Sequence, residues 1–157
     1  MTAHFGPKMM KNNRKKVTRT PDLSTLAYFA EQLRLAGLRL TRQRVAIAAL
    51  LLDGRHRHVS ADSLTEEITA AGIKVSVGTV YNTLNQFTDA GLLRRVLVHN
   101  EYSLFDTNTD HHHHFYDSSS DQLVDIRNDD VILAKLPQAP DGHAIKSVDV
   151  VIHIQSK

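Results

Sequence analysis

Four stretches between residues 22 and 91 repeat apolar side chains every three or four positions, the spacing of one face of an α-helix. Each predicted helix opens at a residue able to cap it and ends near a glycine, which tolerates the backbone of a helix end. The openings are Pro21-Asp22, Thr41, Ser60 and Ser76, and the glycines are Gly37, Gly54, Gly72 and Gly91. The predicted inward positions are Leu23, Leu26, Ala27, Ala30, Leu33, Val45, Ala48, Ala49, Leu52, Leu64, Ile68, Ala71, Val80, Leu84 and Phe87.

After Gly91 the pattern becomes strand-like. Leu92 to Val98 is rich in Leu and Val, residues 99–101 can turn, and Tyr102 to Phe105 returns as a second strand. Helices joined by tight turns and followed by a β-hairpin are typical of the winged helix-turn-helix, in which the helix before the wing enters the major groove. We therefore expect residues 22–108 to form a winged-helix DNA-binding domain.

A second, smaller unit is predicted over residues 109–157. Leu123 to Ile126 resembles a strand, Val131 to Leu136 a short helix, and Ser147 to Gln155 a strand with Val148, Val150, Ile152 and Ile154 on one face. A unit of this size can hardly form an independent core. It is therefore expected to gain stability by pairing with a second copy of itself, as a homodimer. The predicted fold class is α+β, an N-terminal winged helix-turn-helix followed by a small α/β dimerisation domain.

Charge is distributed unevenly along the chain. Residues 1–60 carry 12 Lys and Arg against 3 Asp and Glu, whereas residues 101–157 carry 4 against 10. The basic half suits a polyanion such as double-stranded DNA, and the acidic, histidine-containing half suits cations, although two solvated surfaces would show the same distribution. Residues 1–21 are predicted to be a basic flexible arm that contacts phosphates or stays in solvent.

The chain contains no cysteine and no apolar run of the roughly 18 residues that a membrane span needs. Disulfides and a cysteine-ligated structural zinc are therefore not expected, and any metal has nitrogen and oxygen ligands. A cytoplasmic protein without a membrane partner is predicted.

Polar side chains on the fourth predicted helix form the candidate DNA-reading surface. Short polar groups donate to phosphates, Asn can read adenine, and a tyrosine ring can contact a thymine methyl or a sugar. The alternative is a polar surface helix with a core tyrosine. Together with two upstream arginines, the predicted DNA contacts are Arg39, Arg42, Ser76, Thr79, Tyr81, Asn82 and Thr83.

Four consecutive histidines, His111 to His114, form the second chemical feature. In an extended segment His111 and His113 point to one side and His112 and His114 to the other, so the run can serve two sites. Imidazoles combined with carboxylates favour Fe(II) or Mn(II). The alternatives are an internal tag or a solvated loop without function.

The ordered motifs resemble the ferric uptake regulator family. They are Leu40-Thr-Arg-Gln-Arg-Val45, His58-Val-Ser-Ala-Asp62, Gly78-Thr-Val-Tyr-Asn-Thr-Leu84, Asp89-Ala-Gly-Leu92 and His111-His-His-His114. The following Phe115-Tyr116-Asp117, the ending Val151-Ile-His-Ile-Gln155 and the lack of cysteine are most similar to its iron response regulators, although the Cys-Pro heme motif of some members is absent. The resemblance implies a heme-responsive repressor of iron and heme homeostasis genes.

The resemblance also implies two ligand sets. An interdomain site for Fe(II) or Mn(II), with Zn possible in vitro, would use His58, Asp106, His112, His114 and Asp125, the two aspartates standing where the family typically has glutamates. One ion there would fix the angle between the two halves. Heme would bind through His111, His112 and His113.

Two further family sites are expected to be incomplete. His111 and His113 resemble ligands of a second metal site, but Ile132 and Val148 occupy its remaining positions. Asp117 and Ser120 stand where the first cysteine pair of a structural zinc site would lie.

Two other functions compete with a transcriptional regulator. A metal-dependent hydrolase or oxygenase is disfavoured because no His-Glu-x-x-His helix is present, so we predict that the chain is not an enzyme. A metal- or heme-binding protein without a DNA role is the other alternative. Asn82 stands where many family members have arginine, which indicates a different operator sequence.

Overall fold

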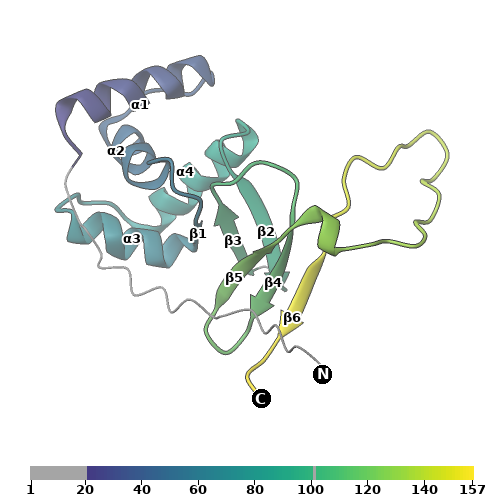
Figure 1. Ribbon diagram of the computed structural model, residues 1–157. Helices are drawn as coiled ribbons and strands as arrows, with labels where there is room; N and C mark the ends of the chain where they lie inside the picture. The colour runs from purple at the N-terminus through teal and green to yellow at the C-terminus, as the bar shows by residue number, and fades with distance from the viewer. Residues whose placement is uncertain (1–20, 101) are drawn as a thin grey trace, which may run out of the picture.

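The computed structural model describes residues 21–100 and 102–157. Its first half contains the helices α1 (Leu23–Leu35), α2 (Arg42–Leu51), α3 (Ala61–Ala70) and α4 (Val77–Asp89) (Figure 1). The predicted caps are confirmed, because the side chains of Asp22, Thr41, Ser60 and Ser76 each accept a hydrogen bond from a first-turn backbone N–H. The four predicted glycines all have positive φ. The predicted basic arm lies outside the described residues, apart from Pro21.

The helices pack around one hydrophobic core, in which Leu33, Leu64, Ile68, Leu84 and Phe87 are fully buried. Most predicted inward positions belong to this core or pack against it. The stripe predicted for α1 is partly wrong, since Leu23 is 85% exposed and Ala27 is exposed. The reason is that α1 contributes Phe29 and Leu33 to the core, which shifts its buried face. None of the described helices is long and apolar enough to cross a membrane.

The first sheet is antiparallel, with the order β1-β3-β2, and contains β1 (His58–Val59), β2 (Arg94–His99) and β3 (Tyr102–Asp106). The β2–β3 pair confirms the predicted hairpin and is consistent with a winged helix. The short strand β1 was not predicted. It pairs with β3, which lies more than 40 residues later in the sequence.

The second sheet has the order β5-β4-β6 and contains β4 (His113–Asp117), β5 (Gln122–Ile126) and β6 (Val151–Ile154). β4 pairs antiparallel with β5 and parallel with β6. The last strand is shorter than the predicted Ser147 to Gln155. Val151 packs against the core of the two sheets, whereas Ile152 and Ile154 are 39% and 40% exposed in the single chain.

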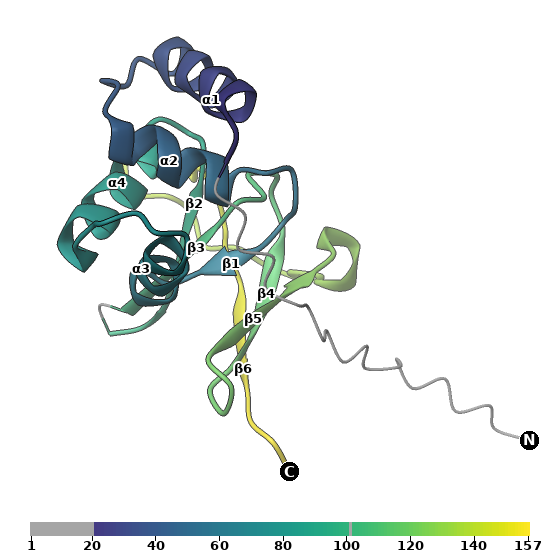
Figure 2. The ribbon, with the colours of Figure 1, turned by 90° about the vertical axis from the view of Figure 1, so that its left-hand side faces the viewer.

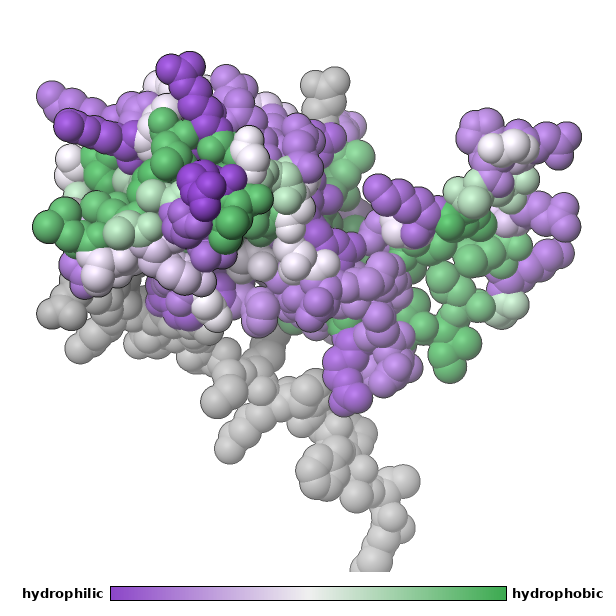
Figure 3. Space-filling view, turned by 90° about the horizontal axis from the view of Figure 1, so that it is seen from above, coloured by the Kyte–Doolittle hydropathy of each residue, from purple (hydrophilic) through white to green (hydrophobic). Residues whose placement is uncertain are grey.

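The predicted helix Val131 to Leu136 is also wrong. Only a 3₁₀ turn, η1 (Asn128–Asp130), follows β5, and residues 131–150 form a long loop standing off the two sheets (Figure 1). A helix this short is unstable without packing, and Ile132 is 89% exposed. Figure 3 shows hydrophobic side chains gathered on this projecting part.

A small apolar cluster joins the two sheets. Val96, Val98 and Leu104 of the first sheet contact Tyr116 and Leu123 of the second. Figures 1 and 2 both place β4 and β5 beside the first sheet, with the helices on the other side of the molecule. The junction between the sheets is thus a fixed surface on which side chains from both halves meet.

Candidate metal centre

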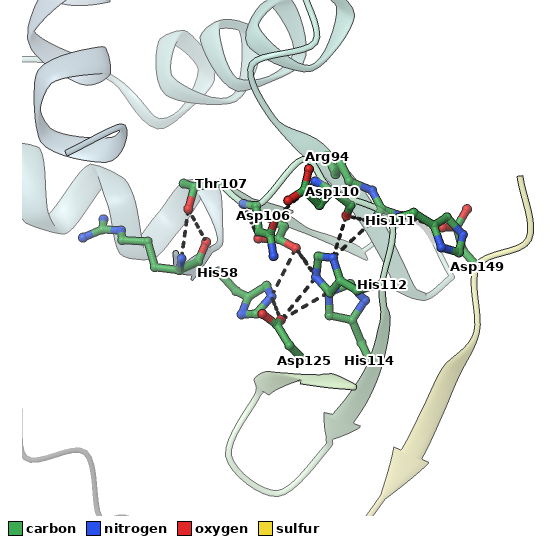
Figure 4. Close-up of polar contacts among 12 residues, drawn as sticks. His58, Arg94, Asp106, Thr107, Asp110, His111, His112, His114, Asp125 and Asp149 are labelled. Atoms are coloured by element: carbon green, nitrogen blue, oxygen red, sulfur yellow. Dashed lines mark hydrogen bonds and ion pairs between the residues drawn. The ribbon is translucent and has the colours of Figure 1, made fainter. Parts of the chain in front are cut away.

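Two strand registers bring histidines and aspartates together at this junction (Figure 4). His58 of β1 lies directly opposite Asp106 of β3, and His114 of β4 lies directly opposite Asp125 of β5. Directly opposite residues present their side chains on the same face, so each sheet supplies one histidine–aspartate pair. His112 precedes β4 by one residue, and its ring centroid is 4.5 Å from that of His114.

The five side chains are spaced like ligands of one ion. One ligand atom from each of them lies within 4.8 Å of all the others. Nε2 of His58 is 2.9 Å from Oδ1 of Asp125, and Nε2 of His112 is 2.9 Å from Oδ2 of Asp106. Around an ion with bonds of about 2.1 Å, adjacent ligand atoms are about 3.0–3.4 Å apart. The sequence-predicted metal set is therefore brought together by the fold.

Two buried nitrogens test whether a metal fits. Nε2 of His58 and Nε2 of His112 have no partner in hydrogen-bond geometry within the described part of the chain, although carboxylate oxygens lie close to both. Buried polar atoms without such a partner are unfavourable, and coordination would use both lone pairs. Three imidazoles and two carboxylates suit Fe(II), Mn(II) or Zn(II). The residues present thus fit a divalent transition metal.

The site also holds charge when no cation is bound. Burial lowers the pKa of His58, but the adjacent carboxylates of Asp106 and Asp125 outweigh it and raise that pKa to about 9. Burial raises the pKa of Asp106, but His114, His58 and the Asn108 N–H lower it far below its usual range. His58, above all, lowers the pKa of Asp125. A proton on His58 therefore occupies the place that a metal would take.

Access to the site is from one side. The side chain of Asp106 is 1% exposed, whereas that of Asp125 is 41% exposed. An ion would therefore enter past Asp125.

His111 and His113 lie on the other side of the run, with ring centroids 5.2 Å apart, so the predicted alternation is observed. Nδ1 of His111 is 3.1 Å from Oδ1 of Asn128, and its Nε2 is 3.1 Å from the carbonyl oxygen of Val148. Val148 thus meets His111 through its backbone, while the exposed Ile132 makes no such contact. The predicted heme residues do not share one face, because His112 belongs to the metal cluster.

The positions of the missing cysteine pair are occupied by a hydrogen-bonded turn. The carboxylate of Asp117 accepts hydrogen bonds from the Ser119 N–H at 2.8 Å and the Ser120 hydroxyl at 2.8 Å. Asp117, Ser119 and Ser120 are thus joined by hydrogen bonds within the turn.

The predicted DNA contacts lie on and beside α4. Ser76, Tyr81 and Asn82 are exposed and Thr79 is half-buried. The outward orientation expected for Thr83 is wrong, since this residue is only 5% exposed. It lies three residues after Val80, on the buried stripe of the helix. Arg39 and Arg42 are exposed.

Tyr81 is shared between the surface and the core. It is 42% exposed, but its ring also meets the ring of Phe105 edge-on, with centroids 6.2 Å apart. The contact with Phe105 agrees with the alternative of a core tyrosine, and the exposed part of the ring is free for the predicted DNA contact.

Arg94 is a residue that sequence reasoning missed. It donates to the backbone carbonyl of Asp110 at 2.8 Å and to the carboxylate of Asp149 at 2.5 Å, beside the metal cluster. The available signal was strand alternation, because Arg94 lies on the same face of β2 as the buried Val96 and Val98.

Comparisons with known proteins agree with this architecture. The Ferric uptake regulator family matches residues 35–154, so the chain belongs to this family. The peroxide-responsive repressor PerR of Staphylococcus aureus (strain Mu50) is 35% identical over 95 residues, a match that covers 60% of this chain and 64% of PerR. The chain thus spans slightly less than two thirds of that curated relative.

Two solved structures extend the comparison over most of the fold. The ferric uptake regulator from Pseudomonas aeruginosa with manganese is 26% identical, with a TM-score of 0.59, and the match covers 82% of this chain and 98% of that one. The regulator from Francisella tularensis with iron is 25% identical, with a TM-score of 0.62, covering 77% and 93%. The fold is Fur-like and of the α+β class. Because members of the family are transcription regulators, the prediction that the chain is not an enzyme is confirmed.

Proposed function

We propose that the protein is a metal-responsive transcriptional repressor that binds double-stranded DNA as a homodimer. The observation that carries the proposal is the convergence of two histidine–aspartate pairs and His112 across the junction of two sheets. The relative named as a repressor, and the relatives solved with manganese and with iron, support it. A cytoplasmic location follows from such a role.

Metal would act by fastening the two halves together. His58 and Asp106 belong to the sheet that packs under the helices, and the other ligands belong to or adjoin the second sheet. An ion bound by both sets favours one relative orientation of the halves over others. DNA affinity then depends on metal, because a dimer must present two recognition helices at the spacing of its operator.

The DNA-binding surface in this proposal is the exposed side of α4. Tyr81 and Asn82 would contact base edges in the major groove, Ser76 and Thr79 would contact phosphates at the start of the helix, and Arg39 and Arg42 would flank them. Thr83 is left out because it is buried.

The proposed physiological ligand is Fe(II) or Mn(II), since mixed imidazole and carboxylate ligation suits these ions, and zinc would bind in vitro. Heme at His111, His112 and His113 stays a prediction taken from the resemblance to the iron response regulators. Because His112 belongs to the metal cluster, heme ligation through this residue would compete with the metal.

The test is the affinity of the full chain for genomic operator fragments, with Mn(II), Fe(II) or heme titrated into metal-free protein. We expect Mn(II) or Fe(II) to change specific affinity at least about tenfold, a coupling of typical size. The effect should vanish in H114A, while H143A, an exposed histidine outside the cluster, should respond normally. Absence of any specific site, with or without ligand, would rule out the proposal.

The role of α4 is tested separately. N82A should lose about 5- to 150-fold in specific affinity, because one base contact is worth roughly 1–3 kcal/mol. T83V, a buried change of similar volume on the same helix, should retain it. Equal affinities for N82A and wild type would show that α4 is not the recognition helix.

A further inference from the structure

Arg94 contacts both the loop before the histidine run and the segment before the last strand. We propose that Arg94 is a positioning residue, which fixes His112 as a metal ligand and ties the metal centre to β6. This inference rests on the proposed function, because it assumes that the cluster binds metal. Arg94 starts β2, where it is the direct strand partner of the ligand Asp106.

The ring of His112 is held against the backbone of the preceding loop. Its Nδ1 lies 2.7 Å from the backbone carbonyl oxygen of Asp110, which can only accept a hydrogen bond. Nδ1 therefore carries a proton, which makes Nε2 the ring nitrogen that can bind a metal. That Nε2 is the atom lying 2.9 Å from Oδ2 of Asp106 in the cluster.

Arg94 holds this carbonyl in place. Its Nη1 donates to the same Asp110 oxygen at 2.8 Å and lies 3.4 Å from Nδ1 of His112. A carbonyl oxygen has two lone pairs and can accept both hydrogen bonds. Outer partners of this kind orient metal-bound histidines and raise the affinity of the site.

The other end of the guanidinium binds the segment before β6. Nη2 donates to the carboxylate of Asp149 at 2.5 Å. The next residue, Val150, donates its N–H to Nδ1 of His113 at 3.3 Å and accepts the N–H of the ligand His114 at 3.0 Å. Arg94 thus anchors the chain at the point where β6 begins to pair with the strand that carries a metal ligand.

The chemistry of the side chain is specific to arginine. A planar guanidinium presents several donors in a fixed arrangement and can bind the carbonyl and the carboxylate at once, whereas lysine has one nitrogen. The next residue, Arg95, supplies a matched control. It is exposed on the opposite face of β2, and its side chain has no hydrogen-bond or ion-pair partner among the described residues.

The experiment compares full-length wild type, R94K, R95K and D149N. In metal-free protein, ring ¹⁵N chemical shifts of His112 should report the Nδ1–H tautomer in wild type, R95K and D149N, and a mixture of tautomers in R94K. Hydrogen exchange should become faster over Val151–Ile154 in D149N and R94K only. Far-ultraviolet circular dichroism checks that each variant is folded.

A titration with Co(II), used as a spectroscopic probe, then measures the site itself. R94K should lose about 10- to 100-fold in affinity and change the intensity of the visible bands, whereas R95K should match wild type. If R94K keeps the Nδ1–H tautomer and binds Co(II) within twofold of R95K, the inference is overturned. If wild type binds no Co(II) but R94K still alters the tautomer, positioning by Arg94 is supported and the proposed function fails.

Discussion

Asp106 is the residue on which the proposed metal centre depends most. Its Oδ2 lies 3.4, 2.9 and 3.2 Å from the Nε2 atoms of His58, His112 and His114. D106N keeps the shape but replaces a charged oxygen ligand with a neutral amide. We expect the Mn(II) affinity of this variant, measured by calorimetry, to fall at least about 100-fold, beyond the usual effect of outer-shell changes.

D110N is the control for that experiment. Asp110 is exposed and takes part in the site through its backbone carbonyl, which the substitution preserves. Affinities of D106N and D110N that agree within threefold would contradict a central role for Asp106.

The raised pKa of His58 predicts a pH dependence in metal-free protein. The folded pKa of about 9 exceeds the ordinary value of 6.5, so the protonated form stabilises the folded state fully below pH 6.5 and this contribution disappears as pH rises through 9. The lowered pKa values of Asp106 and Asp125 act oppositely, stabilising above their ordinary 3.8 and failing at lower pH.

Urea unfolding of metal-free protein between pH 6 and 10 measures this effect. Wild type should lose stability from pH 6.5 to above 9, and H58Q should lack that part of the slope. Parallel curves for the two proteins would show that His58 is not the titrating group.

For single residues, the sequence and the family resemblance together named the five side chains that converge, but not the residues that hold them in place. The alternation of the four histidines follows from the geometry of an extended chain, and the aspartates came from family resemblance. Arg94 and Thr83 were misjudged because their surroundings are set by strand pairing and helix phase. A single-residue pattern does not contain that information.

Among the elements, those specified by local chemistry were predicted correctly. Side-chain caps fix the starts of α2, α3 and α4, and the positive-φ Gly72 and Gly91 directly follow the C-caps of α3 and α4, so these helices followed from the sequence. The strand β1 was missed, because a two-residue strand forms only by pairing with its partner. The helix predicted over residues 131–136 is absent, because a short helix is stable only when it packs against other residues.

β3 and β4 are joined at their far ends by a second contact. The hydroxyls of Tyr102 and Tyr116 donate to the two carboxylate oxygens of Asp121 at 2.6 and 2.8 Å. The same strands end or begin near the metal cluster, at Asp106 and His113. The junction of the sheets is therefore fastened at both ends, and one of these fastenings needs no metal.

Removing both hydroxyls, as Y102F together with Y116F, should lower the free energy of unfolding by about 1–2 kcal/mol, since hydrogen bonds to a charged but exposed group are of modest strength. Urea unfolding of metal-free protein is the measurement. Y81F is the control, because Tyr81 is 42% exposed and its hydroxyl makes no hydrogen bond to the described residues. A loss no larger than that of Y81F would show that the tyrosine–aspartate contact adds nothing.

At the scale of the whole molecule, both halves expose large apolar side chains, and those of the C-terminal half lie on the long loop and on the strands β5 and β6. Ile132, Ile145, Ile152 and Ile154 are 89%, 48%, 39% and 40% exposed. Such surface is typical of an interface between protein chains. The joint cluster of the two sheets, by contrast, was not foreseen, because periodicity within each half says nothing about which faces meet.

The proposed dimer can be tested by sedimentation. Full-length protein should sediment as a dimer at micromolar concentration, and I152D together with I154D should sediment as a monomer, because two charges would be buried unpaired at the interface. L35D, which alters a residue that is 67% exposed on α1, should remain dimeric. A double variant that still dimerises would place the interface elsewhere.

The order of the five proposed metal ligands along the chain has a consequence for protein synthesis. A nascent chain exposes His58 and Asp106 first, while His112, His114 and Asp125 leave the ribosome later. A polypeptide that is truncated before residue 125, or whose strands pair one residue out of register, cannot assemble all five ligands. Full affinity for the ion would therefore belong to finished, correctly paired chains, and incomplete translation products would stay outside the metal-regulated pool.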